Sequence, residues 1–209
     1  MKIAVFGGTG NTGSRVIDAA LARGFEVTAL VREPARVRQS HPRLTVLKGH
    51  PTVASDVAAC VRGADAVVHC LGVGGKGDGK ATTLISDSVK AALVAMEAEQ
   101  VPRIVCMSNL GAGGSGPWWF NRLLIPLFFR WLRPLIDDKD RMEHALRASR
   151  AEWVSVRLVG INEGPAMPTR TSADGLGLGL TITDGSVAEF LLDQVQGSAF
   201  LYQTPSLSN

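Results

Sequence analysis

The sequence of 209 residues predicts an α/β fold, with a doubly wound parallel sheet in a single domain over residues 1–209. Short runs rich in β-branched residues alternate along the chain with amphipathic, alanine-rich stretches, which is the order of strands and helices in such a sheet. The short runs are apolar almost throughout, as in strands that are buried on both faces. With 45% hydrophobic residues, the chain can build a core on each side of the sheet.

Strands are expected where aliphatic and β-branched residues follow one another. In chain order they are Lys2–Phe6, Glu26–Val31, Leu44–Leu47, Ala66–Cys70, Arg103–Met107, Trp153–Arg157 and Ala199–Tyr202. Helices are expected between them, where apolar residues recur at helical spacing. They are Thr12–Arg23, Val53–Val61, Thr82–Glu99, Asp137–Arg150 and Ser186–Val195. Asn11 or Thr12 is expected to cap the first helix at its start, and Gly24 to end it.

A glycine-rich turn, GGTGNTG at residues 7–13, joins the first strand to the first helix. Gly8, Gly10 and Gly13 also satisfy the G-x-G-x-x-G pattern, which is informative when it follows a strand and opens a helix. Glycine at these positions permits a positive φ, a close approach of the backbone to a pyrophosphate, and tight packing of helix on strand. The start of the helix adds free N–H groups that attract phosphates. The turn therefore predicts a Rossmann fold that binds a dinucleotide.

The end of the second strand predicts which dinucleotide is bound. An acid at this place accepts hydrogen bonds from the ribose of NAD, whereas an arginine suits the 2′-phosphate of NADP. Arg32 follows the strand, and Arg36 and Arg38 come within the next two turns. A guanidinium can donate two bonds to a phosphate, so NADP(H) is favoured. The alternative is that these arginines are solvated and that Glu33 takes the ribose.

Composition excludes several classes of function. The 22 basic and 19 acidic residues leave a net charge of +3, which is too small to argue for nucleic acid. No His, Cys, Asp and Glu spacing resembles a set of metal ligands, and no G-x-S-x-G elbow anchors a hydrolase triad. The three cysteines are expected to be reduced core residues, and the four-residue apolar run after Lys2 is too short for a secretory signal. We therefore expect a cytoplasmic protein.

Two stretches break the alternation of strands and helices. Residues 72–80 are rich in glycine and follow the fourth strand, where a mobile loop on the cofactor side is expected. Residues 111–136 form an apolar insertion that includes Trp118 and Trp119. This insertion could be a lid or wall over the cofactor, a dimer contact, a segment resting on a membrane surface, or ordinary buried packing. Its arginines and prolines exclude a membrane span.

The chain resembles the atypical short-chain dehydrogenase/reductases of the NmrA-like and flavin reductase (biliverdin-IXβ reductase) group. The resemblance rests on the glycine turn, on VTALVREPARV, on GADAVVHCLG and on DDKDRMEHALRASRAEWVSVRL, and it is weaker between Asn109 and Ile136. It implies an NADPH-binding protein that is a monomer or weak homodimer. Residues that match the family's cofactor positions, together with neighbours expected to assist them, are Gly7, Gly10, Asn11, Thr12, Gly13, Arg32, Arg36, Leu71 and Gly72.

The catalytic positions depart from the pattern of alcohol-type relatives, which use a Tyr-x-x-x-Lys pair. Ser108 matches the serine that ends the fifth strand, and Lys139 matches the lysine, but Leu135 stands where the tyrosine would be. Ser108 and Lys139 are the candidate catalytic residues, with a purely structural role as the alternative. Glu143 and His144 are expected on the helix surface. Gly49-His50 replaces a Gly-Asp that approaches adenine in relatives.

These observations together predict an NADPH-dependent oxidoreductase that transfers hydride to a flat, conjugated acceptor such as a flavin or quinone. Such acceptors take their proton from water, so the missing tyrosine is not needed. Asn109, Trp118 and Trp119 are expected at the substrate. The alternative is a non-catalytic protein that senses NADP(H) or binds a partner.

Overall fold

The computed structural model describes residues 1–72, 80–119, 122–123, 127 and 130–209. Its main sheet has eight strands in the order β3-β2-β1-β4-β5-β6-β10-β8. The strands are β1 (Lys2–Phe6), β2 (Glu26–Val31), β3 (Leu44–Lys48), β4 (Ala66–His69), β5 (Arg103–Asn109), β6 (Glu152–Leu158), β8 (Arg170–Ser172) and β10 (Ser206–Ser208). All neighbours pair in parallel except β8 and β10. A separate parallel pair joins β7 (Gly160–Asn162) to β9 (Thr181–Thr183). The predicted doubly wound sheet is confirmed.

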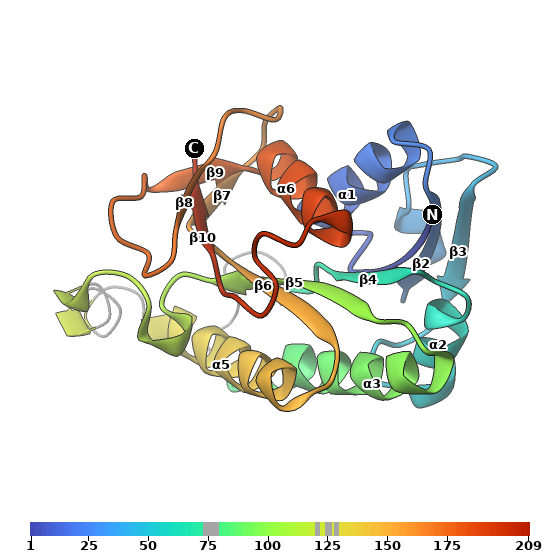
Figure 1. Cartoon of the computed structure of the whole chain (residues 1–209), viewed down its shortest axis with the longest axis horizontal. Helices are drawn as coiled ribbons and strands as arrows, with labels where there is room; N and C mark the ends of the chain where they lie inside the picture. Colours follow the sequence, from blue (N-terminus) through green and yellow to red (C-terminus); the bar gives the residue numbers. More distant parts are fainter. Residues whose placement is uncertain (73–79, 120–121, 124–126, 128–129) are drawn as a thin grey trace.

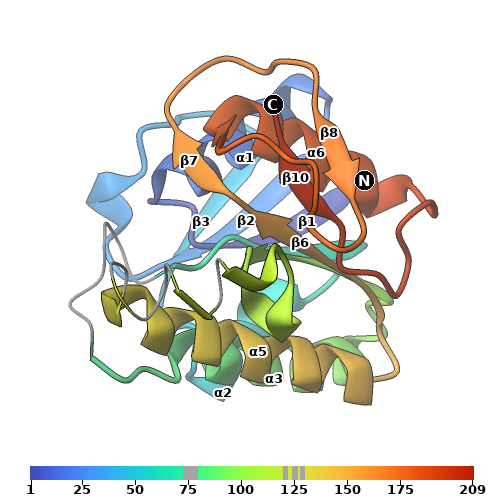
Figure 2. The ribbon, with the colours of Figure 1, turned by 90° about the vertical axis from the view of Figure 1, so that its left-hand side faces the viewer.

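Helices cover both faces of the sheet (Figure 1). One face carries α1 (Asn11–Ala22) and α6 (Asp184–Gln196), and the other carries α2 (Ala54–Val61), α3 (Leu84–Glu99) and α5 (Arg133–Ala148). Single turns of 3-10 helix are η1 (Pro34–Arg36), η2 (Ala112–Gly114) and η4 (Arg130–Leu132). The view turned by 90° shows the same three layers, with the sheet between the two groups of helices (Figure 2).

Two hydrophobic cores follow from this layering, because alternate side chains of each strand point to opposite faces. Ile3 and Val5 of β1 pack under α1 and α6, whereas Ala4 and Phe6 pack over α2 and α3. The apolar character of the strands thus reflects burial on both sides. The edge strands β3 and β8 are the exceptions, since none of their residues is fully buried.

The last strand is not where the sequence predicted it, and this prediction was wrong. Residues 199–202 form successive turns, and Tyr202 has a left-handed backbone with φ of 59°. Gln203 makes a single parallel bridge to Val154 of β6, and the regular strand begins at Ser206, which pairs in parallel with Arg157 of β6. An extended strand at residues 199–202 is excluded by these turns, in which the N–H groups of Leu201 and Gln203 bond back to residues 198 and 200.

Helix α1 ends and begins by different means. Gly24 has φ of +86° and donates its N–H to Leu21, while Phe25 donates to Ala20, so Gly24 ends the helix as predicted. At the start, Gly10 occupies the N-cap position without a capping side chain, so the predicted cap by Asn11 or Thr12 was wrong. The first turn of α1 therefore keeps backbone N–H groups that no cap satisfies.

Helix α3 receives its N-terminal cap from another helix. The Asp138 carboxylate of α5 accepts hydrogen bonds from the backbone N–H groups of Ile85 and Ser86, at 2.9 and 3.3 Å. A buried acid at a helix N-terminus is favoured by the helix dipole as well as by these bonds. The contact fixes α5 beside α3 on the face of the sheet where Lys139 lies.

All three cysteines are free and buried. Burial raises the pKa of the Cys60 and Cys70 thiols to about 12 and also raises that of Cys106. His69 at the end of β4 is buried too, and desolvation lowers its pKa to about 3, so its ring is neutral. It stacks on Phe6 and contacts the Ser88 hydroxyl at 2.9 Å.

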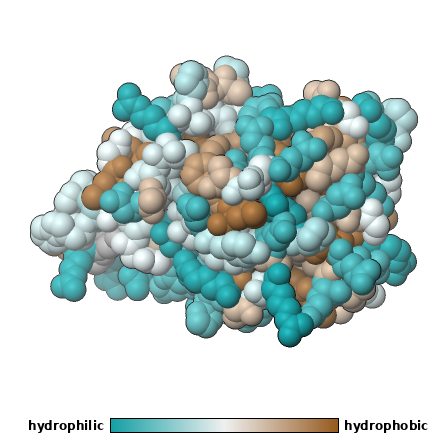
Figure 3. All heavy atoms as spheres, viewed as in Figure 1, coloured by the Kyte–Doolittle hydropathy of each residue, from teal (hydrophilic) through white to brown (hydrophobic). Residues whose placement is uncertain are grey.

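The surface mixes polar and apolar residues on the face shown in Figure 3, where hydrophobic residues gather near the middle and hydrophilic ones along the lower edge. Within the described ranges, no helix has both the length and the apolar character required to cross a membrane. Large exposed apolar side chains include Trp118, Leu127 and Leu180.

Candidate functional site

A cavity of about 1060 Å³ lies at the carboxyl ends of the central strands. Such volumes are typical of sites for small molecules or cofactors, and this edge of a doubly wound sheet is where ligands bind. The lining includes Gly7, Thr9, Gly10, Asn11, Thr12, Gly13, Arg32, Arg36, Cys70, Leu71, Gly72, Lys80, Ala81, Thr82, Leu84, Met107, Ser108, Asn109, Trp131, Pro134, Leu135, Lys139 and Ile161. The structure thus brings every predicted cofactor residue, both candidate catalytic residues and Asn109 to one cavity.

The glycine turn has the shape that a phosphate group requires. Gly7 has φ of +88°, and a Cβ atom there would lie 2.8 Å from the Cys70 carbonyl group, so only glycine fits. Gly13 packs directly on Gly7, which lets α1 approach β1 closely. Gly10 has ordinary backbone angles and room for a Cβ atom, so its lack of a side chain keeps the cavity open. The uncapped N–H groups at the start of α1 complete an anion site.

Basic residues line the cavity in more than one place. Arg32 and Arg36 follow β2, and Lys80 and Lys139 line the cavity farther along. No acidic side chain stands among the described residues that line it. Glu33, the alternative ribose acceptor, is exposed and lies 3.8 Å from the Arg36 guanidinium. These charges fit a polyanionic ligand, and the donor set of turn, helix start and arginine fits a phosphorylated dinucleotide.

Lys139 is buried at the cavity wall and makes its bonds to backbone carbonyl groups. Its Nζ donates to the carbonyl oxygens of Leu71 at 3.2 Å and Met107 at 2.5 Å. Leu71 follows the end of β4, and Met107 lies two residues before the end of β5, so the lysine joins the two segments that border the cavity. Burial lowers the pKa of Lys139 to about 8, which brings loss of its proton close to neutral pH. Among the described residues, neither Asp140 nor Glu143 forms an ion pair or a hydrogen bond with Lys139.

Ser108 belongs to a buried network centred on Glu143. The Ser108 hydroxyl donates to Glu143 Oε1 at 2.8 Å, and the Ser155 hydroxyl of β6 donates to the same oxygen at 3.3 Å. Arg157 of β6 donates through Nε and Nη2 to the two carboxylate oxygens, at 3.0 and 2.6 Å. Arg147, one helical turn beyond Glu143, donates to Oε2 at 3.0 Å. Glu143 therefore accepts bonds from two hydroxyls and two guanidinium groups.

The expectation that Glu143 lies on the helix surface was wrong, because its side chain is fully buried. Burial alone would raise the pKa of this carboxyl, but the bonds and charge of Arg157, with help from Ser108 and Arg147, hold it below its ordinary value. Glu143 is thus ionised. His144, which was also expected on the helix surface, is exposed as predicted.

Two signals in the sequence could have located this network. Glu143 follows Lys139 at the i+4 position, so both share a helix face with the buried residue Leu146. Arg157 lies inside the apolar strand WVSVRL, and a charge in a buried strand requires a partner. Gly113 packs directly against this network. A Cβ atom at this position would lie 2.2 Å from Arg157 Nη2.

The apolar insertion contributes to the cavity through its C-terminal part. Trp131 lines the cavity together with Pro134 and Leu135. Trp118 and Trp119 do not belong to the described lining, and their exposed fractions are 70% and 44%. Residues 120–121, 124–126 and 128–129 of the insertion, and residues 73–79 of the predicted mobile loop, lie outside the described residues.

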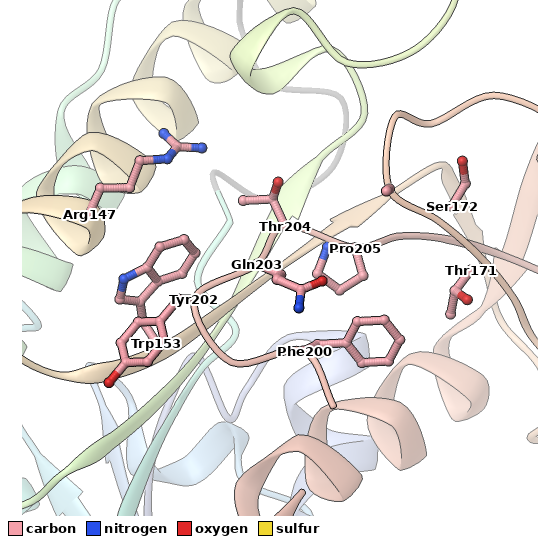
Figure 4. Close-up of a pocket in the computed structure, with 10 residues that line it drawn as sticks. Arg147, Trp153, Thr171, Ser172, Phe200, Tyr202, Gln203, Thr204 and Pro205 are labelled. Carbon is pink, nitrogen blue, oxygen red and sulfur yellow. The ribbon is translucent and has the colours of Figure 1, made fainter. Parts of the chain in front are cut away.

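A second, smaller hollow of about 260 Å³ lies near β6 and the C-terminal segment (Figure 4). Arg147 and Trp153 border it, with the guanidinium carbon 6.0 Å from the indole centroid. Tyr202, the only tyrosine of the sequence, packs edge-on against Trp153 here. The tyrosine therefore belongs to a different pocket from Lys139, while Leu135 occupies the cavity wall near the lysine. Within the part of the chain that the structure describes, no cluster of three or more His, Cys, Asp or Glu residues could hold a metal.

Comparison with known proteins adds a family match. A family model described as NAD(P)H-binding matches residues 7–197. Among curated proteins, a 3-beta-hydroxysteroid dehydrogenase from Mycolicibacterium neoaurum is 35% identical over 72 residues, which are 34% of this chain and 19% of that protein. The match thus spans about a fifth of the length of this curated relative.

Solved structures share the fold over the whole chain. A short-chain dehydrogenase/reductase from Veillonella parvula, crystallised in complex with NADP, has a TM-score of 0.80 at 14% identity, with 100% of this chain and 94% of that chain covered. An anaerobillin reductase from Escherichia coli O157:H7 has a TM-score of 0.81 at 22% identity, with coverage of 100% and 97%. A Lactobacillus casei protein has a TM-score of 0.82 at 23% identity, with coverage of 100% and 99%. At these identities the likeness establishes the fold.

Proposed function

Because this chain belongs to the NAD(P)H-binding family, we propose that it is an NADPH-dependent reductase that transfers hydride to a flat, conjugated acceptor such as a flavin or quinone. One observation carries the proposal: a single cavity extends from a phosphate-binding turn to an apolar wall. Gly10 and Arg32 stand at one end, and Trp131 and Leu135 belong to the wall. A hydride donor and a planar acceptor would thus share one cavity.

The residues at the basic end would hold the cofactor. The N–H groups at the start of α1 would bind its pyrophosphate, and Arg32 would bind the 2′-phosphate through its planar guanidinium. Leu71 and Gly72, which follow β4, would lie against its middle part. Bound NADPH supplies a hydride, and the protein supplies binding and orientation.

The residues at the other end would accommodate the acceptor. Trp131, Pro134, Leu135 and Ile161 offer apolar surface to a planar ring, and Asn109 adds an amide at the end of β5. The position four residues before Lys139 holds Leu135, which has no proton to give. An acceptor whose reduced form takes a proton from water suits this wall, and flavins and quinones have this property.

Turnover with a panel of acceptors tests the proposal. NADPH oxidation is measured by absorbance with a soluble flavin, a quinone, a bilin and a steroid ketone, the last because of the curated relative's name. A flavin or quinone should be reduced, and the Gly10→Val variant should show no activity above background. Reduction of the ketone alone would contradict the choice of acceptor.

A second candidate function is a protein that senses NADP(H) and binds a partner without catalysis. The exposure of Trp118 supports it, because a tryptophan exposed to 70% is typical of an interaction surface rather than of a core. The same panel separates the two functions. A protein that binds NADPH tightly but oxidises it with none of the four acceptors is a sensor.

A further inference from the structure

The hydroxyl group of Ser108 can only accept a hydrogen bond from a ligand. A serine has one proton to donate and two lone pairs that accept. The proton of Ser108 is donated to Glu143 Oε1 at 2.8 Å, and an ionised carboxylate has no proton to return. Glu143 is held in this state by Arg157 and Arg147. Ser108 lines the cavity, so its hydroxyl oxygen can offer a ligand only its lone pairs, which accept a hydrogen bond.

Lys139 offers the opposite chemistry beside it. An ammonium group has three donors and no acceptor. Two of the donors bond to the carbonyl oxygens of Leu71 and Met107, which leaves one N–H. The Met107 carbonyl belongs to the peptide group that joins Met107 to Ser108, so the ammonium lies next to the serine. The cavity wall therefore presents one donor and one acceptor as neighbours.

We propose that Lys139 and Ser108 form a recognition site for an amide or imide edge, in which a carbonyl oxygen stands beside an N–H group. The carbonyl oxygen accepts from Lys139, and the N–H donates to Ser108. This inference rests on the proposed function for the identity of the ligand, because it concerns the same cavity. In this site the serine accepts a hydrogen bond from the ligand, whereas a serine that binds a substrate carbonyl donates one. Glu143 is assigned as the residue that determines this direction, because it takes the serine proton.

Two ligands of the proposed reaction carry this edge. The nicotinamide ring bears a primary carboxamide, and the flavin ring bears an N3–H between two carbonyl groups. Each has a close analogue that keeps a carbonyl and replaces the N–H function by a methyl group. These analogues are 3-acetylpyridine adenine dinucleotide phosphate for NADP⁺ and 3-methyllumiflavin for lumiflavin.

The test measures dissociation constants for both pairs, by calorimetry for the nucleotides and by fluorescence quenching for the flavins. The ratio of analogue to parent is compared between the unmodified protein and Ser108→Ala. For the pair whose N–H is recognised, the ratio should fall by about threefold to tenfold in the variant, the size of one neutral hydrogen bond. The pair that responds identifies the source of the N–H.

Ser155→Ala is the matched control. Ser155 also donates to Glu143 Oε1 but does not belong to the described lining of the cavity, so its removal disturbs the network without touching a ligand. Its ratios should equal those of the unmodified protein. Lys139→Met should weaken both members of the responding pair and leave their ratio unchanged, because both keep the carbonyl. Circular dichroism verifies that each variant is folded.

Unchanged ratios for both pairs in Ser108→Ala would overturn the proposal, and so would an equal fall in Ser155→Ala. Because every reading is a binding constant, it does not depend on turnover. A ratio that falls in Ser108→Ala, in a protein that reduces no acceptor, would support this site and contradict the proposed reductase. Turnover with unchanged ratios would support the reductase and contradict this site.

Discussion

Gly13 and Gly7 are packed so closely that a Cβ atom on Gly13 would lie 2.1 Å from the Gly7 carbonyl oxygen. The equivalent atom on Gly10 would lie 3.4 Å from that same oxygen, an ordinary contact. The two glycines of the turn therefore serve different ends. Gly13 allows the helix to pack on the strand, and Gly10 leaves space beside the first turn of α1.

This difference predicts separate effects on folding and binding. Gly10→Val should leave the melting temperature nearly unchanged and abolish NADPH binding, because its side chain would enter the phosphate site. Gly13→Ala should lower the stability by at least about 1–3 kcal/mol through overpacking against backbone. Thermal unfolding and calorimetric titration measure the two effects. Gly10→Val that binds NADPH normally would show that the phosphates lie elsewhere.

Replacing Arg32 with alanine should erase most of the preference for NADPH over NADH. The expected loss is about 1.5–3 kcal/mol, the value of hydrogen bonds to a charged group. Arg38 is exposed and absent from the described lining, so Arg38→Ala is the matched control. Dissociation constants for both cofactors test the assignment. Equal constants in the unmodified protein would refute it.

Removing only one partner of the buried ion pair between Arg157 and Glu143 should lower the free energy of unfolding strongly. Arg157→Leu leaves the buried Glu143 without its main partner and should destabilise the protein by about 3–5 kcal/mol. The double variant Glu143→Leu with Arg157→Leu removes both charges and should be more stable than the single variant. Urea unfolding measures the stability of both variants. A double variant that is less stable than Arg157→Leu would show that an unpaired Glu143 is not the cause of the loss.

The same carboxylate predicts how stability depends on acid. The pKa of Glu143 is lower in the folded protein than in the unfolded chain, so its contribution is complete above the unfolded value of about 4.3. It is lost as the pH falls from there through the folded value, since the unfolded chain binds the proton first. Unfolding free energies at several acidic pH values should fall less steeply for Glu143→Gln. Identical slopes would exclude Glu143 as the titrating group.

Lys139 predicts a limit on the alkaline side. The pKa of this amine is lowered to about 8, so its ammonium donor is lost as the pH rises through that value. If it holds the ligand carbonyl, kcat/KM should fall above about pH 8, because this parameter reports the free protein. Lys139→Met should have a lower kcat/KM near neutral pH and no inflection near 8. An inflection that persists in Lys139→Met would assign it to another group.

Replacing the tryptophans of the insertion tests whether this segment is a lid over the acceptor or an interface with a partner. If Trp118 and Trp119 close over the acceptor, their joint replacement by alanine should raise the KM of the acceptor with little change in kcat. Trp131→Ala should do so in any case, because this side chain already lines the cavity. A double variant with unchanged kinetics would place Trp118 and Trp119 at an interface instead.

The sequence was sufficient for the parts of the fold that local chemistry determines. Periodic apolar runs located β1, β2 and β4, and the glycine turn located the phosphate end of the cavity. The three-residue strands β8 and β10 are too short to show periodicity, and they are set by pairing with β6 and with each other. Tertiary contacts decide such strands, so the pattern at residues 199–202 was misleading.

The site was predictable in its parts and not in its connections. Ser108 and Lys139 were recognised separately, but the polarity of the serine depends on Glu143, which belongs to another element. Burial of that acid depends in turn on Arg157 from β6. The charge of Arg157 in an apolar strand indicates that a partner is required, but neither segment alone indicates which acid is that partner.

The burial of the three cysteines has a consequence for the chemical durability of the protein. Thiols react with oxidants and with electrophilic quinones as thiolates, and groups with a pKa near 12 have almost no thiolate at neutral pH. Cys70 borders the cavity, so an electrophile bound there would meet this thiol in its unreactive form. Incubation with a benzoquinone followed by mass spectrometry should find Cys60, Cys70 and Cys106 unmodified in the folded protein and alkylated after denaturation. The fold would then protect its own sulfur from the class of compound it is proposed to reduce.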